Sequence, residues 1–263
     1  MKKRRGERVT GRPGDAHPVS DSPPLPLSDL RVLLWDLDGT LVRGKRFGAF
    51  KDYTVPMLEA VFGTAGCLHE LVVNGMTDLQ IVEEALRGSG ITREHINSRR
   101  EELLRCYMDE MKRATGNGMQ ILEAMPGARE VLKAVNEHPR YASALLTGNI
   151  EPAAHLKVEL TGLDGFFPLP GAFGDESFDR RDLPAIAAQR INEHLGAQLQ
   201  PEQFIVIGDT PNDIACARHF GARVVAIATG RVHSADELRA HEPDALLADL
   251  LNVELVMRTL DEI

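Results

Sequence analysis

The stretch that most constrains the fold reads RVLLWDLDGTLV and runs from Arg31 to Val42. Its apolar residues 32–35 have the length of one buried parallel strand. Asp36 and Asp38 follow, and residues two apart in an extended chain point the same way, so both carboxylates can face one pocket. Open α/β sheets bind ligands beyond the carboxyl ends of their strands, which is where this pocket is predicted.

Two carboxylates this close repel each other, and a shared proton or a metal ion relieves the repulsion. Oxygen ligands at a strand end suit Mg²⁺. The pair suits chemistry in which one Asp is the nucleophile and the other the acid/base. The alternative is a polar turn, since Asp38-Gly39 is an ordinary turn pair. Chance should produce Asp-x-Asp-Gly-Thr in fewer than about one in a hundred chains of this length, which favours the functional interpretation.

The composition is that of a water-soluble globular protein. The chain has 263 residues, of which 43% are hydrophobic and 26% charged, enough for one large domain or a core with an insertion. A net charge of −9 argues against a nucleic-acid surface, and the lack of an apolar run near 18 residues argues against a membrane span. The three cysteines (Cys67, Cys106 and Cys216) are far apart and are expected to be reduced in a cytoplasmic protein.

Three regions differ in their pattern. Residues 1–28 are basic and rich in Gly and Pro, so we expect a disordered extension or a misassigned translation start; a basic patch for nucleic acid or lipid is the alternative. From about Asp52 to Ala124 the chain has helical periodicity and no convincing strand, which predicts an all-helical cap at residues 45–124 whose last short helix holds Ile121 and Leu122. Residues 29–44 and 125–263 form the expected core.

The core alternates between strand and helix patterns. Strands are expected at 32–35, 141–146, 166–169, 204–207, 222–228 and 245–247. Helices are expected at 128–137, after 149, at 182–195 with Asp182 as cap, and at 211–220, 234–240 and 250–260. This alternation predicts an α/β fold with a doubly wound parallel sheet.

Polar residues end two further strands. Thr147-Gly148-Asn149 offers a hydroxyl and backbone N–H groups near a helix N-terminus, which suits a phosphate, although Asn149 could simply cap the helix. Asp209 follows its strand just as Asp36 follows the first and is a candidate metal ligand. Asp213 lies in a start resembling a capping box, and a capping carboxylate can still support a metal site.

An anionic substrate beside these carboxylates needs a positive group. Arg180 and Arg181 precede the predicted helix at 182–195, and either could reach the pocket; an exposed arginine pair is the alternative.

The chain resembles the haloacid dehalogenase superfamily of aspartate-nucleophile hydrolases, in particular its phosphoglycolate-phosphatase-like branch. The resemblance spans residues 31 to about 250. DLDGT at 36–40 matches the first family motif, Thr147 ends the second, and GDTPND at 208–213 matches the fourth. The insertion resembles the cap of this branch, over a Rossmann-like core.

The resemblance implies a mechanism with named roles. Asp36 would attack phosphorus to form an aspartyl-phosphate, while Asp38 would protonate the leaving oxygen and then activate water. Thr147 and the Gly148 amide would hold the phosphoryl group. The implied Mg²⁺ ligands are the Asp36 side chain, the Asp38 backbone carbonyl and Asp209, with Asp213 in support.

One departure concerns the third family motif, usually a lysine. Arg180 aligns best with it, which keeps the charge but changes the donor geometry. The expected substrate is a small phosphorylated metabolite, because such a cap closes over the site. Gly75–Asp78 could form part of a substrate loop, although helix capping by Thr77 or Asp78 also explains it.

Other reactions of the superfamily are the alternatives. Asp38 argues against a dehalogenase, and a phosphonatase would need a cap lysine such as Lys51 or Lys112. A sugar-phosphate mutase and a catalytically inactive binding protein are the remaining possibilities.

Overall fold

A computed structural model describes residues 26–46, 48–116 and 122–263 of the chain. The predicted disordered extension lies almost entirely outside these residues, and its last two residues belong to a single 3₁₀ turn, Leu27–Asp29. None of the helices that the structure describes is long and apolar enough to cross a membrane.

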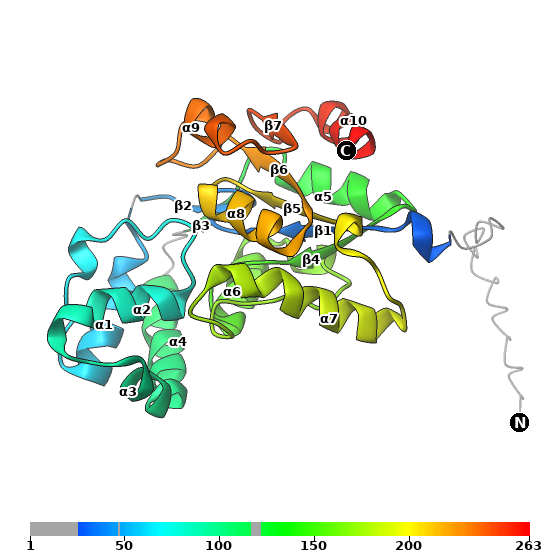
Figure 1. The fold of residues 1–263 in the computed structure, drawn as a ribbon. Coiled ribbons are helices and arrows are strands. Elements are labelled where there is room, and N and C mark those ends of the chain that lie inside the picture. Colours follow the sequence, from blue (N-terminus) through cyan, green and yellow to red (C-terminus); the bar gives the residue numbers. More distant parts are fainter. Residues whose placement is uncertain (1–25, 47, 117–121) are drawn as a thin grey trace, which may run out of the picture.

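A parallel sheet of five strands forms the centre of the core (Figure 1). Its strand order is β4-β1-β5-β6-β7, so the first strand lies between β4 and β5. The strands are β1 Arg31–Trp35, β4 Tyr141–Leu145, β5 Phe204–Gly208, β6 Arg223–Ile227 and β7 Ala245–Leu247. The predicted α/β fold with a doubly wound parallel sheet is confirmed.

Helices cover both faces of the sheet, as the continuous apolar runs of its strands require. The core helices are α5 Ala128–Glu137, α6 Glu151–Thr161, α7 Leu183–Leu195, α8 Pro211–Phe220, α9 Ala235–Ala240 and α10 Val253–Glu262. One hydrophobic cluster joins α5 and α10 to one face, and a second joins α7 and α8 to the other. Trp35 is fully buried in the first cluster, and its Nε1–H donates to Ser143 Oγ at 3.1 Å.

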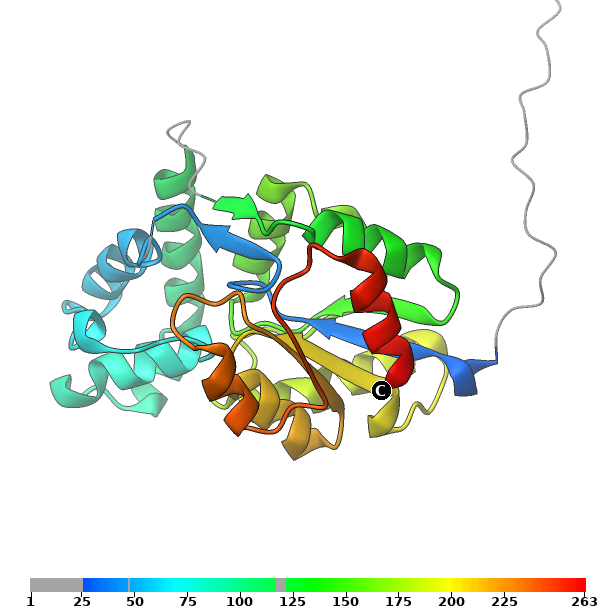
Figure 2. The same cartoon turned by 90° about the horizontal axis from the view of Figure 1, so that it is seen from above.

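Four helices lie together beyond one end of the sheet, and both views separate them from the core (Figure 2). They are α1 Lys51–Phe62, α2 Asp78–Leu86, α3 Arg93–Ser98 and α4 Arg100–Gly116, and with their connections we call them the cap. Buried side chains such as Met57, Leu68 and Met111 give the cap a hydrophobic cluster of its own. Ile150 and Ala153, at the start of core helix α6, belong to the same cluster and connect cap and core.

The prediction that residues 52–124 contain no strand is wrong, because a short strand lies at their end. A two-stranded antiparallel sheet pairs β2 Val42–Gly44 with β3 Leu122–Ala124, where we expected Leu122 in a short helix. The hydrogen-bond partners of β3 come from β2, about 80 residues earlier in the chain. An Arg43–Glu123 ion pair of 2.6 Å also joins the two strands. Ile121, the other residue of that expected helix, lies outside the described residues.

Three smaller predictions in the core also fail. Residues 166–169 form no strand; Leu169 N–H donates to Ser143 O at 3.3 Å, but the segment makes no ladder along the edge of β4. The last helix begins at Val253 instead of 250, because Asn252 Oδ1 accepts from Leu255 N–H and caps it there. Asp182 stands at the N-cap of α7 but makes no capping hydrogen bond, since Ser177 Oγ donates to its carboxylate.

Candidate active site

Three buried carboxylates meet at the carboxyl ends of β1 and β5. Asp36 follows β1, Asp209 follows the neighbouring β5, and Asp213 lies in the first turn of α8. One oxygen from each lies within 4.8 Å of the other two. Sequence analysis predicted all three, and the structure brings them together.

Glycines make room for this cluster. A Cβ on Gly39 or on Gly230 would overlap the Asp209 carboxylate, and one on Gly208 would overlap that of Asp213. Gly39 also has φ +97°, a conformation that favours glycine, so the turn after Asp38 needs this residue for two reasons.

Burial and mutual repulsion disfavour ionisation of these carboxylates. Burial, together with the charge of Asp213, raises the pKa of Asp36 from 3.8 to about 7. Burial and the charge of Asp36 raise the pKa of Asp209 well above its ordinary value. Such shifts are expected where carboxylates share a dry site, and they favour binding of a positive group.

Arg180 supplies one positive group. Its Nη2 donates to Asp36 Oδ1 at 2.9 Å and to Asp213 Oδ1, and its side chain is buried. Although burial opposes its charge, the carboxylates of Asp213 and Asp36 raise the pKa of Arg180. Arg181 points to the surface and pairs with Asp179. Of the two candidate arginines, the structure places Arg180 at the site.

The donor set fits a divalent metal ion. Three carboxylates with one arginine leave a net negative charge in a buried site, and oxygen-only ligands are those that Mg²⁺ prefers. The buried Nε–H of Arg180 has no hydrogen-bond partner among the described residues. The side chain of Asp38 lies outside the cluster, in line with a contribution through its backbone only.

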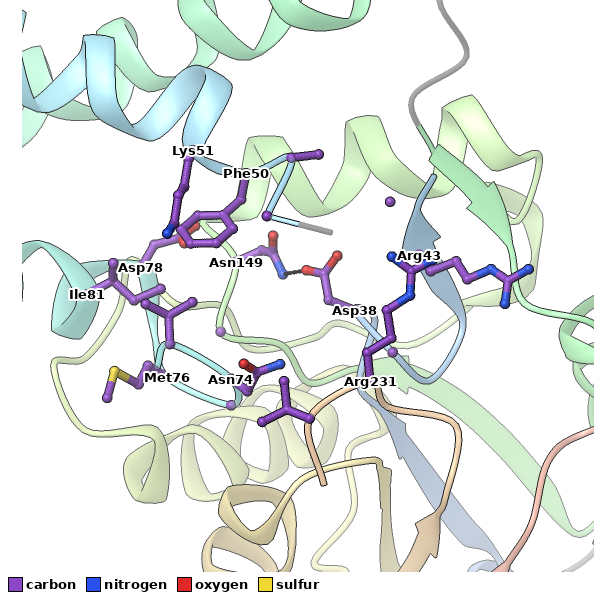
Figure 3. Close-up of a pocket in the computed structure, with 18 of the residues that line it drawn as sticks. Asp38, Arg43, Phe50, Lys51, Asn74, Met76, Asp78, Ile81, Asn149 and Arg231 are labelled. Atoms are coloured by element: carbon purple, nitrogen blue, oxygen red, sulfur yellow. Dashed lines mark hydrogen bonds between the residues drawn. The ribbon is translucent and has the colours of Figure 1, made fainter. Parts of the chain in front are cut away.

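The Asp38 carboxylate turns instead toward α6 (Figure 3). Its Oδ2 accepts from Asn149 Nδ2 at 2.7 Å and from Lys157 Nζ at 2.5 Å. The side chain is 47% exposed and lines the cavity. The two aspartates of the first motif therefore occupy different environments, which is how paired acids acquire different roles.

Thr147 and Asn149 form one hydrogen-bonded unit after β4. Thr147 Oγ1 accepts from the Asn149 backbone N–H at 3.2 Å and from Nδ2 at 2.8 Å. Asn149 does not cap α6. The N-cap position is occupied by Ile150, and no side chain caps the helix there. The Gly148 carbonyl accepts from the Asp78 N–H of the cap at 2.6 Å, so this loop also contacts the cap.

A cavity of about 870 Å³ lies between the cap and the core loops that carry Asp38 and Gly148. Gly75, Met76 and Asp78 line it, and Thr77 caps α2 by accepting from Gln80 N–H at 3.1 Å, so the predicted helix cap is confirmed and the substrate-loop role stays a prediction. Asp78 Oδ2 also accepts from the Ile150 N–H of the core at 2.9 Å. Burial raises the pKa of Asp78 to about 6.

Sequence analysis missed Lys157. It lies on the inward face of α6 with Ala153, Ala154 and Val158, and only 3% of it is exposed. A lysine on the apolar stripe of a helix needs a buried partner, and that spacing was the available signal. We had considered only the lysines of the cap.

The comparisons with known proteins agree with this geometry. The chain is 26% identical over 242 residues to a phosphoglycolate phosphatase of Vibrio vulnificus, covering 87% of this chain and 97% of the relative. Among solved structures, a predicted phosphoglycolate phosphatase from Haemophilus somnus has a TM-score of 0.58 at 19% identity, with 88% of this chain and 100% of that chain covered. A hydrolase from Pseudomonas syringae has a TM-score of 0.60 at 24% identity, with 89% and 99% covered. The family model of haloacid dehalogenase-like hydrolases matches residues 33–218, and the chain therefore belongs to this family.

Proposed function

We propose that the chain is a metal-dependent phosphatase that hydrolyses a small phosphomonoester through an aspartyl-phosphate on Asp36. The observation that carries the proposal is the pairing of a buried cluster, Asp36 with Asp209, Asp213 and Arg180, with a separate acid, Asp38, at the cavity wall. The relative named a phosphoglycolate phosphatase, which is similar over most of both chains, supports the same reaction class.

Each group has a role that its surroundings support. Asp36 is the nucleophile, and the charge of Arg180 beside it opposes the rise in the Asp36 pKa that burial and Asp213 cause and attracts the phosphoryl oxygens. Asp38 transfers protons, because its carboxylate is within reach of the cavity. Thr147 and the Gly148 amide hold the phosphoryl group at the end of β4. Bound Mg²⁺ would be held by Asp36, Asp209 and Asp213 with the Asp38 carbonyl, and it would neutralise charge on the phosphoryl oxygens.

The position of the cap favours a small substrate. Asp78 and the loop before it hydrogen-bond to the core beside the site, so the cavity is roofed by the cap. Arg43, Lys51 and Arg231 line the cavity and suit an anionic metabolite. A phosphorylated protein or nucleic acid would have to displace this roof.

The test is phosphate release from a panel of small esters, including phosphoglycolate, with Mg²⁺ and with EDTA. We expect release that depends on the metal and that falls by at least about a thousandfold in Asp36→Asn. The wild-type enzyme should also carry a phosphoryl group after acid quenching, and the variant should not. Absence of release from every ester would overturn the proposal.

Including a phosphonate in the panel tests the phosphonatase alternative. Lys51 lines the cavity, but its Nζ donates to His69 O at 3.2 Å in an exposed position. Lys112 is not among the residues that line the cavity. A Schiff-base lysine usually needs a dry or cationic environment, so we expect no turnover of the phosphonate.

A further inference from the structure

A buried lysine contacts the residue that we assign to proton transfer. The Nζ of Lys157 donates to Asp38 Oδ2 and to Asn149 Oδ1, both at 2.5 Å. An ammonium group is costly to bury unless it is paired and hydrogen-bonded, and here two partners satisfy it. Although burial opposes its charge, the carboxylate of Asp38 raises the pKa of Lys157, which keeps it protonated.

The hydrogen bonds to Asp38 are all on one side of its carboxylate. Lys157 Nζ and Asn149 Nδ2 both donate to Oδ2, at 2.5 and 2.7 Å. Oδ1 accepts no hydrogen bond from any side chain or backbone group in the described part of the chain. One oxygen is therefore held against α6 and the other is left for the cavity that Asp38 lines.

Lys157 is itself held firmly. Only 4% of its side chain is exposed, and Asn149 is fixed in turn by two hydrogen bonds to Thr147 Oγ1. On the cap side, the Asp78 carboxylate also raises the pKa of the same ammonium group. Rotation of the Asp38 carboxylate away from this position would leave a buried charge without its partner.

We infer that Lys157 is a positioning residue for proton transfer by Asp38, a conclusion that rests on the proposed phosphatase function. Because two donors already occupy Oδ2, a proton that Asp38 takes up for transfer is held on Oδ1. In the first step the bond from phosphorus to Asp36 forms, the bond to the leaving oxygen breaks, and the Oδ1 proton moves to that oxygen. In the second step water attacks phosphorus, gives its proton to Oδ1, and Asp36 is released.

The leaving group provides a test that a purely structural role would not affect. A nitrophenolate ion leaves readily without a proton, whereas the alkoxide of an alkyl phosphate such as phosphoglycolate needs one. In Lys157→Met, kcat/KM should fall on the order of 10- to 100-fold for the alkyl ester and less than about threefold for nitrophenyl phosphate. The ratio of the two values does not depend on how much of the preparation is folded.

Two comparisons complete the experiment. Lys133→Met removes a surface ammonium group that is 68% exposed, and it should leave both values unchanged. In an Asp38→Asn background, Lys157→Met should cost the alkyl ester little more, because the group that it positions has been removed.

The outcomes separate the two proposals. Equal losses for the two esters in Lys157→Met, or a full additional loss in the Asp38→Asn background, would overturn the positioning role and leave the phosphatase function intact. Absence of release from either ester by the wild-type enzyme would overturn the phosphatase function and the inference with it.

Discussion

Asp213 contributes to a helix and to the candidate site at the same time. Its Oδ2 accepts from Thr210 N–H at 3.0 Å and from Thr210 Oγ1 at 2.7 Å, which completes the capping box of α8. Its Oδ1 accepts from Arg180. The capping explanation is therefore confirmed, and it leaves room for the functional explanation, because a carboxylate has two oxygens to share.

Replacing Arg180 should reduce stability and activity far more than replacing its neighbour Arg181. Arg180→Met leaves the carboxylates of Asp36 and Asp213 buried without their partner, so we expect a loss of stability of about 3 kcal/mol or more and of activity of about 100-fold or more. Arg181→Met breaks only the exposed pair with Asp179 and should change stability by less than about 1 kcal/mol. Urea unfolding and phosphate release measure both. Similar losses in the two variants would contradict the placement.

Stability without metal should depend on pH through Asp36. Its pKa is raised from 3.8 to about 7, so the folded chain holds this proton more tightly than the unfolded chain. The resulting stabilisation is complete below about pH 4 and is lost as the pH rises through about 7. With EDTA present, the free energy of unfolding should therefore fall over this interval, by an amount on the order of a few kcal/mol.

Urea titrations at several pH values in this interval measure the slope. Asp36→Asn should make the decline less steep, because the amide does not titrate, while Asp78 and Asp209, whose pKa values are also raised, keep part of it. Asp29→Asn at an exposed position should leave the slope unchanged. Mg²⁺ should also reduce the decline by binding the ionised carboxylates. An unchanged slope in Asp36→Asn would show that Asp36 does not titrate in this range.

Individual site residues were predictable to the extent that their signal is local. Asp36, Asp38 and Asp209 follow apolar strands directly, so a short stretch of sequence identifies them. The contact of Lys157 with Asp38 joins residues 119 apart and depends on how α6 packs, which no local pattern encodes. The choice of Arg180 over Arg181 depended in the same way on which side chain the fold buries.

Elements were predicted well where the hydrophobic pattern is strong and less well at the sheet margins. All five strands of the central sheet are long enough or apolar enough to be recognised, and each lies where it was expected. The three-residue strands β2 and β3 are stabilised by each other across about 80 residues, so neither has a signal of its own. Residues 166–169 are apolar because they pack along the sheet, without joining it.

The contact between α2 and the loop after β4 is close-packed and can be tested at one glycine. A Cβ on Gly174 would overlap the Gly148 carbonyl, which accepts from the Asp78 N–H at the start of α2. Gly174→Ala should therefore displace this junction, at a cost of about 1–3 kcal/mol in stability, and raise KM. Gly165→Ala is the matched control, because nothing lies within 4 Å of its added methyl group. Thermal unfolding and steady-state kinetics of both variants decide whether the junction matters.

Cap and core share apolar contacts at the level of the whole molecule. Ile150 is the N-cap of core helix α6 but is buried in the hydrophobic cluster of the cap. The two parts are therefore expected to unfold together in a single calorimetric transition.

Ile150→Ala should weaken this coupling. The cavity it creates should cost about 2–5 kcal/mol, and the cap should then melt before the core, so that one calorimetric peak becomes two. Leu160→Ala, which trims an exposed side chain on the same helix, should keep one peak at nearly the same temperature. A single sharp peak in Ile150→Ala at the wild-type temperature would show that this contact does not couple cap and core.

The position of Trp35 allows its fluorescence to report on the site. It is the only tryptophan in the chain, it is fully buried, and the next residue is Asp36. An indole in a dry environment emits at short wavelength, and its emission responds to charges placed nearby. Arrival of an ion or a phosphoryl group at Asp36 changes the field beside a single fluorophore, so occupancy of the site can be followed by light in the unlabelled protein.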